Sequence, residues 1–292
     1  MVLKTYFGFS CYSEMRCKIF SISIILFLVV GCASRKYSDV SYSVDGLKKS
    51  DNQLNIFVPR SIDTTQKYPV MVFVYGGNWH SGSKGIYNSI GRNFAKKGII
   101  TFIPNYTKSP KVSYDEMTQE IATSIRWVKK NIHQYHGDTN RLYLSGHSAG
   151  GHLSALSILS PKYGIDQEKI AGLILIDAAG LDMYSYLKDN PPTKKNHYLT
   201  TWTNNADEWK KASPLYYVNK KLPPLMVYVG EKTYPSIKSS NRRFIKKVKE
   251  KDSKIEVIYL NKRHMSMITQ FMRGQNKRYD EVIEFMTAVS GD

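Results

Sequence analysis

Gly146-His147-Ser148-Ala149-Gly150 is a Gly-x-Ser-x-Gly pentapeptide that joins two segments of different character. The preceding residues 141–145 (RLYLS) are short and alternating, as in a strand, whereas residues 151–159 (GHLSALSIL) are small and apolar, as in a buried helix. This setting predicts a tight strand-to-helix turn that holds the Ser148 hydroxyl above the end of a sheet. The helix N-terminus beside it favours negative charge. The stretch therefore predicts a nucleophilic serine rather than an ordinary glycine-rich turn.

Apolar runs alternate with amphipathic segments on both sides of this turn, and they predict an α/β fold. Strands are expected at 52–58, 68–75, 99–104, 141–145, 170–176, 225–229 and 255–260, and helices at 86–97, 114–135, 151–159, 236–251 and 278–288. This alternation is typical of a mostly parallel sheet with helices on both faces. The 292-residue chain is long enough for one such domain. The segment 181–222 is its one sizeable insertion, at a place where a substrate lid is expected.

The first 31 residues have the pattern of a secretory signal. Arg16 and Lys18 precede an apolar run at residues 21–30, which is too short to span a membrane comfortably. An uncleaved N-terminal anchor is the alternative, and it leaves the domain on the same side of the membrane.

Val29-Val30-Gly31-Cys32 resembles the bacterial lipoprotein signal. The resemblance implies cleavage before Cys32 and acylation of that cysteine, and Ala33 in place of Asp implies an outer-membrane protein that faces the periplasm. The expected organisation is a lipoprotein signal peptide (1–31), a lipidated Cys32 with a polar tether (32–49), and a single α/β domain (50–292). Multiple acyl chains would make a stable membrane anchor.

The chain is strongly basic, with a formal net charge of +18. Lysines are spread along the sequence, with a local cluster at 242–251, and we interpret them as a solvated surface rather than a lipid-binding patch. No motif supports nucleic-acid binding. No His-Glu-x-x-His, paired Cys-x-x-Cys or strand-linked Gly-x-Gly-x-x-Gly pattern is present, so neither a metal nor an organic cofactor is expected.

Four segments of residues 50–290 resemble the α/β-hydrolase family. The likeness is greatest to the small esterases that include arylformamidases, prenylcysteine methylesterases and bacterial carboxyl and feruloyl esterases. The segments are Val74–Lys84, similar to the family's H-G-G-x-W-x-x-G-x-K loop, Arg126–Ile132, the pentapeptide itself, and Arg263–Ile268. The family's first loop histidine is Tyr75 here, a departure expected to alter the scaffold more than the chemistry.

The resemblance assigns roles to individual residues. Ser148 is the expected nucleophile, and His264, which follows the last strand, is the expected base because the family order is serine, acid, histidine. The oxyanion hole is expected from the backbone N–H groups of Gly77, Asn78 and Ala149. His147 and His152, which flank the nucleophile, are expected to be structural, with a place in the pocket lining as the alternative for His147. Trp79 is expected to be a pocket wall, with ordinary core as the alternative.

The triad acid is the open point, because Thr233 stands where the family usually has an aspartate after the penultimate strand. Asp177 ends the preceding strand, where some lipases of this fold carry their acid, and is the first candidate. Glu231 is the second candidate and Asp182 the third. A serine–histidine dyad without an acid remains an option, at a cost on the order of 10⁴ in turnover.

These features together predict a lipid-anchored serine hydrolase that cleaves a small carboxylic ester, or an activated amide, through an acyl-enzyme. The expected partners are the ester substrate and the membrane that holds the lipid anchor. The alternative is a catalytically impaired hydrolase scaffold retained as an envelope binding protein. The absence of the usual acid motivates that alternative, and the presence of both Ser148 and His264 argues against it.

Overall fold

The computed structural model describes residues 34–42, 51–193, 198–219, 221–251 and 254–291. The predicted signal peptide and Cys32 lie outside these ranges and stay predictions. Within the ranges, no helix is both long and apolar enough to cross a membrane.

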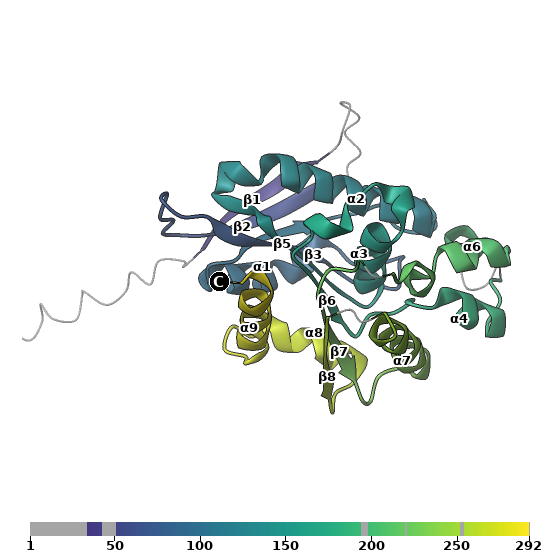
Figure 1. Ribbon diagram of the computed structural model, residues 1–292. Coiled ribbons are helices and arrows are strands. Elements are labelled where there is room, and N and C mark those ends of the chain that lie inside the picture. The colour runs from purple at the N-terminus through teal and green to yellow at the C-terminus, as the bar shows by residue number, and fades with distance from the viewer. Residues whose placement is uncertain (1–33, 43–50, 194–197, 220, 252–253, 292) are drawn as a thin grey trace, which may run out of the picture.

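The described chain forms an eight-stranded sheet with the strand order β1-β2-β4-β3-β5-β6-β7-β8 (Figure 1). β2 pairs antiparallel with both β1 and β4, and all other neighbouring strands are parallel. The strands are β1 (Ser34–Ser41), β2 (Gln53–Pro59), β3 (Tyr68–Val74), β4 (Ile100–Pro104), β5 (Gly137–His147), β6 (Gly172–Ile176), β7 (Leu225–Gly230) and β8 (Ile255–Leu260). The mostly parallel sheet predicted from the sequence is confirmed.

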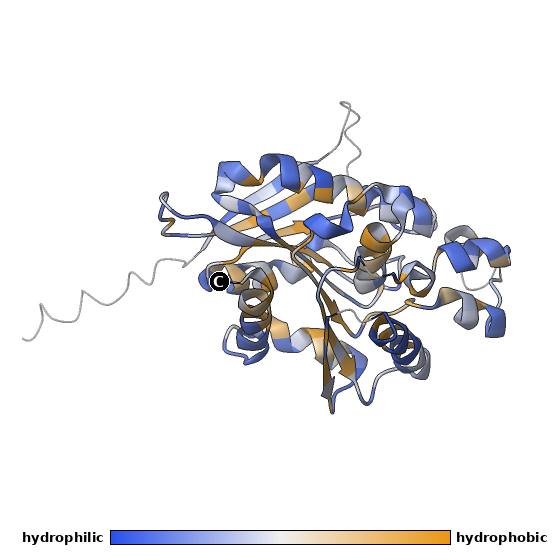
Figure 2. Cartoon of the chain, viewed as in Figure 1, coloured by the Kyte–Doolittle hydropathy of each residue, from blue (hydrophilic) through white to orange (hydrophobic). Residues whose placement is uncertain are grey.

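Helices cover both faces of the sheet, with their polar sides outward (Figures 1 and 2). α1 (Asn88–Lys96) and α9 (Arg278–Ser290) share one face, where Lys97 at the end of α1 pairs with Asp280 of α9 at 2.8 Å. α2 (Tyr114–Asn131) and α3 (Ala149–Leu159) pack together on the other face, and α7 (Pro235–Lys249) packs beside β7 and β8. Two predicted helices differ at their ends. The expected helix at 86–97 begins as a 3₁₀ turn, and that at 114–135 ends as one.

Within its described residues, 181–193, 198–219 and 221–222, the insertion contains three short helices and a 3₁₀ turn. These are α4 (Met183–Asp189), α5 (Tyr198–Trp202), α6 (Ala206–Lys211) and the turn Pro214–Tyr217. The remaining helix, α8 (His264–Thr269), follows β8.

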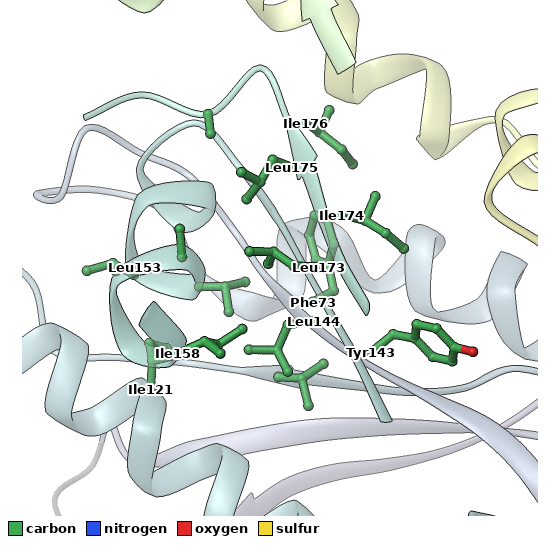
Figure 3. Packing of buried hydrophobic residues seen from close by; sticks show 14 of the residues in the cluster. Phe73, Ile121, Tyr143, Leu144, Leu153, Ile158, Leu173, Ile174, Leu175 and Ile176 are labelled. Carbon is green, nitrogen blue, oxygen red and sulfur yellow. The ribbon is translucent and has the colours of Figure 1, made fainter. Parts of the chain in front are cut away.

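Apolar side chains of the central strands point alternately to the two helix layers (Figure 3). Leu144 and its neighbour Leu173 are fully buried toward α3. Tyr143 points the opposite way, where its hydroxyl donates to the Met286 carbonyl oxygen of α9 at 2.9 Å. Full burial of a leucine is worth about 2–3 kcal/mol. This packing fixes β5 and β6, whose carboxyl ends carry Ser148 and Asp177.

The segment expected to be a polar tether contains a strand. Ser34–Ser41 forms β1 at the edge of the sheet and pairs with β2 from Ser34 opposite Pro59 to Ser41 opposite Gln53, with a register shift between Tyr37 and Val40. Most of its side chains are exposed, so it lacks the apolar alternation that marks a half-buried strand. Backbone pairing holds this strand, and the sheet therefore includes residues that precede the predicted boundary at residue 50.

Candidate active site

Ser148 occupies a strained turn between β5 and α3. Its backbone has φ 54° and ψ −124°, a region that non-glycine residues rarely adopt. A Cβ on Gly146 would lie 2.5 Å from the Gly150 carbonyl carbon, and one on Gly150 would lie 2.1 Å from the Val74 carbonyl oxygen. Only glycine fits at either position, which explains the first and last residues of the Gly-x-Ser-x-Gly pentapeptide.

Ser148, His264 and Asp177 form one hydrogen-bonded chain. His264 Nε2 lies 2.8 Å from Ser148 Oγ, and His264 Nδ1 lies 2.6 Å from Asp177 Oδ2. Asp177 is fully buried, and the His264 side chain is 11 % exposed. With Nδ1–H donated to the carboxylate, Nε2 is free to accept the serine proton. The structure thus brings together the predicted nucleophile, the predicted base and the first of the three acid candidates.

The other two acid candidates lie elsewhere. Asp182 is buried, caps the N-terminus of α4 by accepting from Ser185 N–H at 3.1 Å, and pairs with Arg243 at 2.5 Å. Glu231 is exposed on the loop after β7, and its backbone N–H donates to the Leu260 carbonyl oxygen. Neither carboxylate makes a described hydrogen bond to His264.

Three donors hold the Asp177 carboxylate. Its Oδ1 accepts from the Gly230 N–H at 3.0 Å, and its Oδ2 accepts from the Thr233 hydroxyl at 2.5 Å as well as from His264. Asp177 has a positive φ of 46°, so the chain turns sharply at the end of β6. The next residue, Ala178, packs against α3, where a Cβ on Gly151 would lie 2.6 Å from the Ala178 Cβ.

The loop after β3 passes directly over the nucleophile. A Cβ on Gly76 would lie 2.9 Å from the Ser148 Cβ, so only glycine allows this approach. Gly77, Asn78 and Trp79 all have positive φ values, of 142°, 50° and 62°. Three successive positive φ values turn the chain sharply at this point of the loop. Ala149, as the first residue of α3, has an N–H without an acceptor inside the helix. The three predicted oxyanion donors therefore lie on two backbone segments in contact with Ser148.

Tyr75 supports this loop, as expected from its place in the motif. The ring is fully buried and stacks on Tyr106 at 4.8 Å between centroids, and its hydroxyl donates to Asn105 Oδ1. Tyr106 in turn donates to the Tyr75 carbonyl oxygen at 3.1 Å. Tyr75 therefore links the end of β3 to the end of β4 and does not line the cavity.

The two histidines beside the nucleophile are buried and neutral. Burial lowers the pKa of His147 to about 3, and the neighbouring His264 adds to this effect. Burial likewise lowers the pKa of His152 to about 4. His152 Nδ1 accepts from Trp79 Nε1 at 3.1 Å, so its Nε2 carries the proton and donates to the Ala212 carbonyl oxygen at 2.7 Å. Both rings have structural contacts, as expected.

A cavity of about 680 Å³ opens in front of Ser148 and His264. Aromatic and aliphatic side chains from the loop after β3, from α4 and α5, and from α7 and α8 form most of its wall. Trp79 is at once a pocket wall and nearly buried, at 4 % exposure. Met183, Tyr186 and Tyr198 belong to the 181–222 insertion, so this segment covers the site as predicted. Across the described ranges, no three His, Cys, Asp or Glu side chains gather as metal ligands do.

A comparison with protein-family models matches residues 54–241 to the model described as BD-FAE. The match spans more than half of the chain and includes the loop after β3 and the pentapeptide. The chain belongs to the BD-FAE family.

Relatives in sequence carry esterase names. The chain is 25% identical over 265 residues to an isoprenylcysteine alpha-carbonyl methylesterase of Arabidopsis thaliana, covering 82% of this chain and 60% of that protein. It is 28% identical over 204 residues to the probable carboxylic ester hydrolase LipM of Mycobacterium tuberculosis, covering 66% of this chain and 47% of that one. The chain thus spans about half to three fifths of the length of these relatives.

Solved structures agree on the fold. Esterase B from Lactobacillus rhamnosis, inhibited by a tributyrin phosphonate, superposes with a TM-score of 0.75 at 17% identity, covering 89% of this chain and 87% of that one. Thermogutta terrifontis esterase 2 superposes with a TM-score of 0.69 at 20% identity, covering 88% and 92%. The α/β-hydrolase fold expected from the sequence is confirmed.

The site is completed by contacts that patterns in the sequence do not predict. The sequence marks Thr233 only as the place of a missing acid, whereas in the structure its hydroxyl bonds to Asp177. His147 stacks on His264, and Tyr234 packs against the same ring at 5.3 Å. The positions of Thr233 and Tyr234, immediately after β7, are the one signal in the sequence that places them near the histidine loop.

Proposed function

We propose that this protein hydrolyses carboxylic esters through an acyl-enzyme on Ser148. The single observation that carries the proposal is the Ser148–His264–Asp177 hydrogen-bonded chain at the floor of the cavity. The esterase names among the relatives support the same chemistry.

The geometry supports a two-step displacement. Ser148 Oγ attacks the ester carbonyl carbon while its proton passes to His264 Nε2, and Asp177 stabilises the imidazolium that forms. The carbonyl oxygen becomes an oxyanion, for which the backbone N–H groups of Gly77, Asn78 and Ala149 are the candidate donors. His264 returns the proton to the departing alkoxide, and the alcohol leaves. Water then attacks the acyl carbon while its proton passes to His264, and His264 returns that proton to Ser148 Oγ as the acyl–oxygen bond breaks and the carboxylic acid leaves.

The lining of the cavity favours an uncharged ester with an apolar group. Of the described residues that line it, none is lysine or arginine, and the one carboxylate apart from the triad, Asp182, is paired with Arg243. Two lining hydroxyls are already bonded to backbone, Ser81 to the Gly77 carbonyl oxygen and Ser240 to that of Ile237. A charged substituent would thus lose its hydration without gaining an ionic partner.

A fluorophosphonate probe tests the nucleophile. Folded wild-type protein is expected to label and Ser148→Ala is not, with p-nitrophenyl butyrate hydrolysis lost in parallel. Absence of labelling in folded wild type would contradict the proposal and favour the impaired binding protein. For the substrate class, p-nitrophenyl butyrate is expected to exceed the anionic p-nitrophenyl hemisuccinate at least tenfold in kcat/KM, and equal values would contradict an uncharged site.

The proposal for location is a lipid anchor on Cys32 in the outer membrane, facing the periplasm. It rests on the Val29–Cys32 sequence. β1 begins at Ser34 and runs in the same direction as the central strands. Its first residue therefore lies at the amino ends of these strands, whereas Ser148 follows the carboxyl end of β5. An anchor only two residues away would turn the cavity away from the bilayer. Cys32→Ser is expected to release soluble protein, whereas membrane retention of that variant would favour an uncleaved anchor.

A further inference from the structure

Trp79 ends a strained run of backbone in the loop after β3. Glycine adopts a positive φ at little cost, but Asn78 and Trp79, at 50° and 62°, are strained in that conformation. Strained backbone persists where the surrounding structure holds it. Inside the loop, the Gly77 carbonyl oxygen accepts from His80 N–H at 3.1 Å and from Ser81 N–H at 2.9 Å. The contacts that Trp79 makes outside the loop are therefore the ones that fix the loop to the rest of the fold.

Three of these outside contacts hold both the backbone and the ring of Trp79. Its carbonyl oxygen accepts from the N–H of Ser109, in the segment that joins β4 to α2, at 3.0 Å. Its ring N–H donates to Nδ1 of His152, on α3, at 3.1 Å. Trp202 of α5 packs against the ring in a T-shaped arrangement, with ring centroids 4.8 Å apart. Neither the backbone nor the ring can move without breaking one of these contacts.

All three partners of Trp79 are tied to the 181–222 insertion. Thr201 of α5 donates its hydroxyl to Ser109 Oγ at 2.6 Å, and both side chains are buried. His152 Nε2 donates to the carbonyl oxygen of Ala212, directly after α6, at 2.7 Å. The third partner, Trp202, belongs to the insertion itself and is fully buried. Thr201, Trp202 and Ala212 are not among the described residues that line the cavity, so they have no contact with a substrate bound there.

We propose that the insertion holds the oxyanion loop (Gly77–Trp79) in its catalytic conformation, and that Thr201 and Trp202 are positioning residues for this loop. The inference rests on the proposed function. Donors to an oxyanion act because they are fixed in place before the reaction, so a small displacement of the loop raises the energy of the transition state. Binding of the ground-state ester depends on the cavity walls, so the effect is expected in kcat rather than in KM.

The first experiment measures kcat and KM for p-nitrophenyl butyrate in variants of α5. Thr201→Val keeps the shape of the side chain and removes its hydroxyl, and it is expected to lower kcat about three- to tenfold with KM within about twofold of wild type. Thr201→Ser keeps the hydroxyl and is expected to retain wild-type kcat. Thr200→Val is the matched control, because Thr200 is exposed on the same helix. It is likewise expected to retain wild-type kcat.

A butyl trifluoromethyl ketone tests the oxyanion loop more directly. Ser148 Oγ adds to its carbonyl carbon, the serine proton passes to His264, and the carbonyl oxygen becomes an oxyanion that has no leaving group to expel. The inhibition constant is expected to rise in Thr201→Val by the same factor as kcat falls, because the adduct and the transition state need the same donors. A purely structural role of Thr201 would lower the thermal unfolding midpoint without changing this constant.

Wild-type kcat and inhibition constant in folded Thr201→Val, or equal losses in Thr200→Val, would overturn the positioning role. If Thr201→Val does not fold, Trp202→Phe provides the same test. This change removes no described hydrogen bond, because Trp202 Nε1 has no partner among the described residues. It is expected to lower kcat and weaken the ketone in parallel, and wild-type values would overturn the proposal.

Other variants test the proposed function separately. Asp177→Asn is expected to lose on the order of 10⁴ in kcat, because the amide favours the wrong imidazole tautomer. Wild-type kcat in that variant, or hydrolysis that survives Ser148→Ala, would overturn the proposed mechanism rather than the role of the insertion.

Discussion

His147 and His264 stack with ring centroids 4.7 Å apart, and His147 Nε2 lies 3.3 Å from the His264 backbone carbonyl oxygen. Because burial lowers the pKa of His147 to about 3, its ring stays neutral at pH 7 and adds no positive charge beside the base. His147, the residue directly before Ser148, thus binds the backbone of the catalytic base His264. The Nδ1 of His147, near Gly76, has no hydrogen-bond partner among the described residues.

This contact predicts a difference between two substitutions of His147. Gln keeps an N–H at nearly the position of Nε2, whereas Leu fills similar volume without a donor. His147→Leu is expected to lower kcat three- to tenfold, since the His264 carbonyl loses its donor and the loop loosens. His147→Gln should stay closer to wild type. Steady-state kinetics on p-nitrophenyl butyrate measure both, and equal losses in the two variants would show that the hydrogen bond does not matter.

The buried His152 predicts a loss of stability in mild acid. Its pKa is lowered to about 4 in the folded protein, against an ordinary value of 6.5. As the pH falls below 6.5, the unfolded chain binds a proton that the folded protein does not, so the free energy of unfolding decreases until the folded ring is protonated near pH 4. Between pH 7.5 and 5 the loss from this residue is about 2 kcal/mol.

His152→Gln removes this titration while retaining an amide that can donate to Ala212. Urea unfolding at pH 7.5 and pH 5 measures the free energy in both proteins. The decrease on acidification is expected to be smaller in the variant by about 2 kcal/mol. His147 titrates in the same direction in both proteins, so its effect cancels. An equal decrease in wild type and variant would mean that His152 is not the neutral buried group described above.

Much of the fold is encoded in local patterns, and the exceptions have physical reasons. Buried parallel strands are continuous apolar runs, so Tyr68–Val74 and Leu225–Gly230 are recognisable without a structure. β1 is not, because edge pairing needs backbone groups rather than apolar side chains. The change from α-helix to 3₁₀ helix at Ile132–Tyr135, ahead of β5, likewise leaves no mark in the apolar periodicity.

The site was only partly predictable for a similar reason. Ser148 and His264 are marked by short motifs, whereas the acid depends on which way a side chain points at the end of a strand. Asp177 faces His264 because its backbone adopts a positive φ and because Thr233 and Gly230 hold its oxygens. Asp182, five residues later, is equally acidic and buried but is taken up by α4 and Arg243. Composition and spacing do not distinguish these two environments.

The close packing at the glycines around Ser148 predicts that one added methyl group lowers the stability of the fold strongly. Gly150→Ala would place its Cβ 2.1 Å from the Val74 carbonyl oxygen, which cannot be relieved without moving β3. We expect a loss of several kcal/mol in the free energy of unfolding, as overpacking in a dense interior entails. Gly85→Ala is the control, because its Cβ would meet nothing closer than the Ser83 hydroxyl at 3.9 Å. Thermal melts compare the two, and a Gly150→Ala protein as stable as the control would refute the close packing.

The ion pair between Asp182 and Arg243 is expected to stabilise the fold without contributing to catalysis, in contrast to the Asp177 carboxylate at His264. Asp182 is 1 % exposed and its Oδ2 lies 2.5 Å from Arg243 Nε. Arg243→Met leaves that carboxylate buried without its cation, which costs about 2–4 kcal/mol in the free energy of unfolding. Arg243→Met/Asp182→Asn removes the buried charge and should recover part of this loss. Both variants are expected to keep kcat within threefold of wild type under conditions where they are folded, since neither residue bonds to His264. Urea unfolding and kinetics on the same preparations test this, and a kcat loss comparable to that of Asp177→Asn would place Asp182 in the catalytic chain instead.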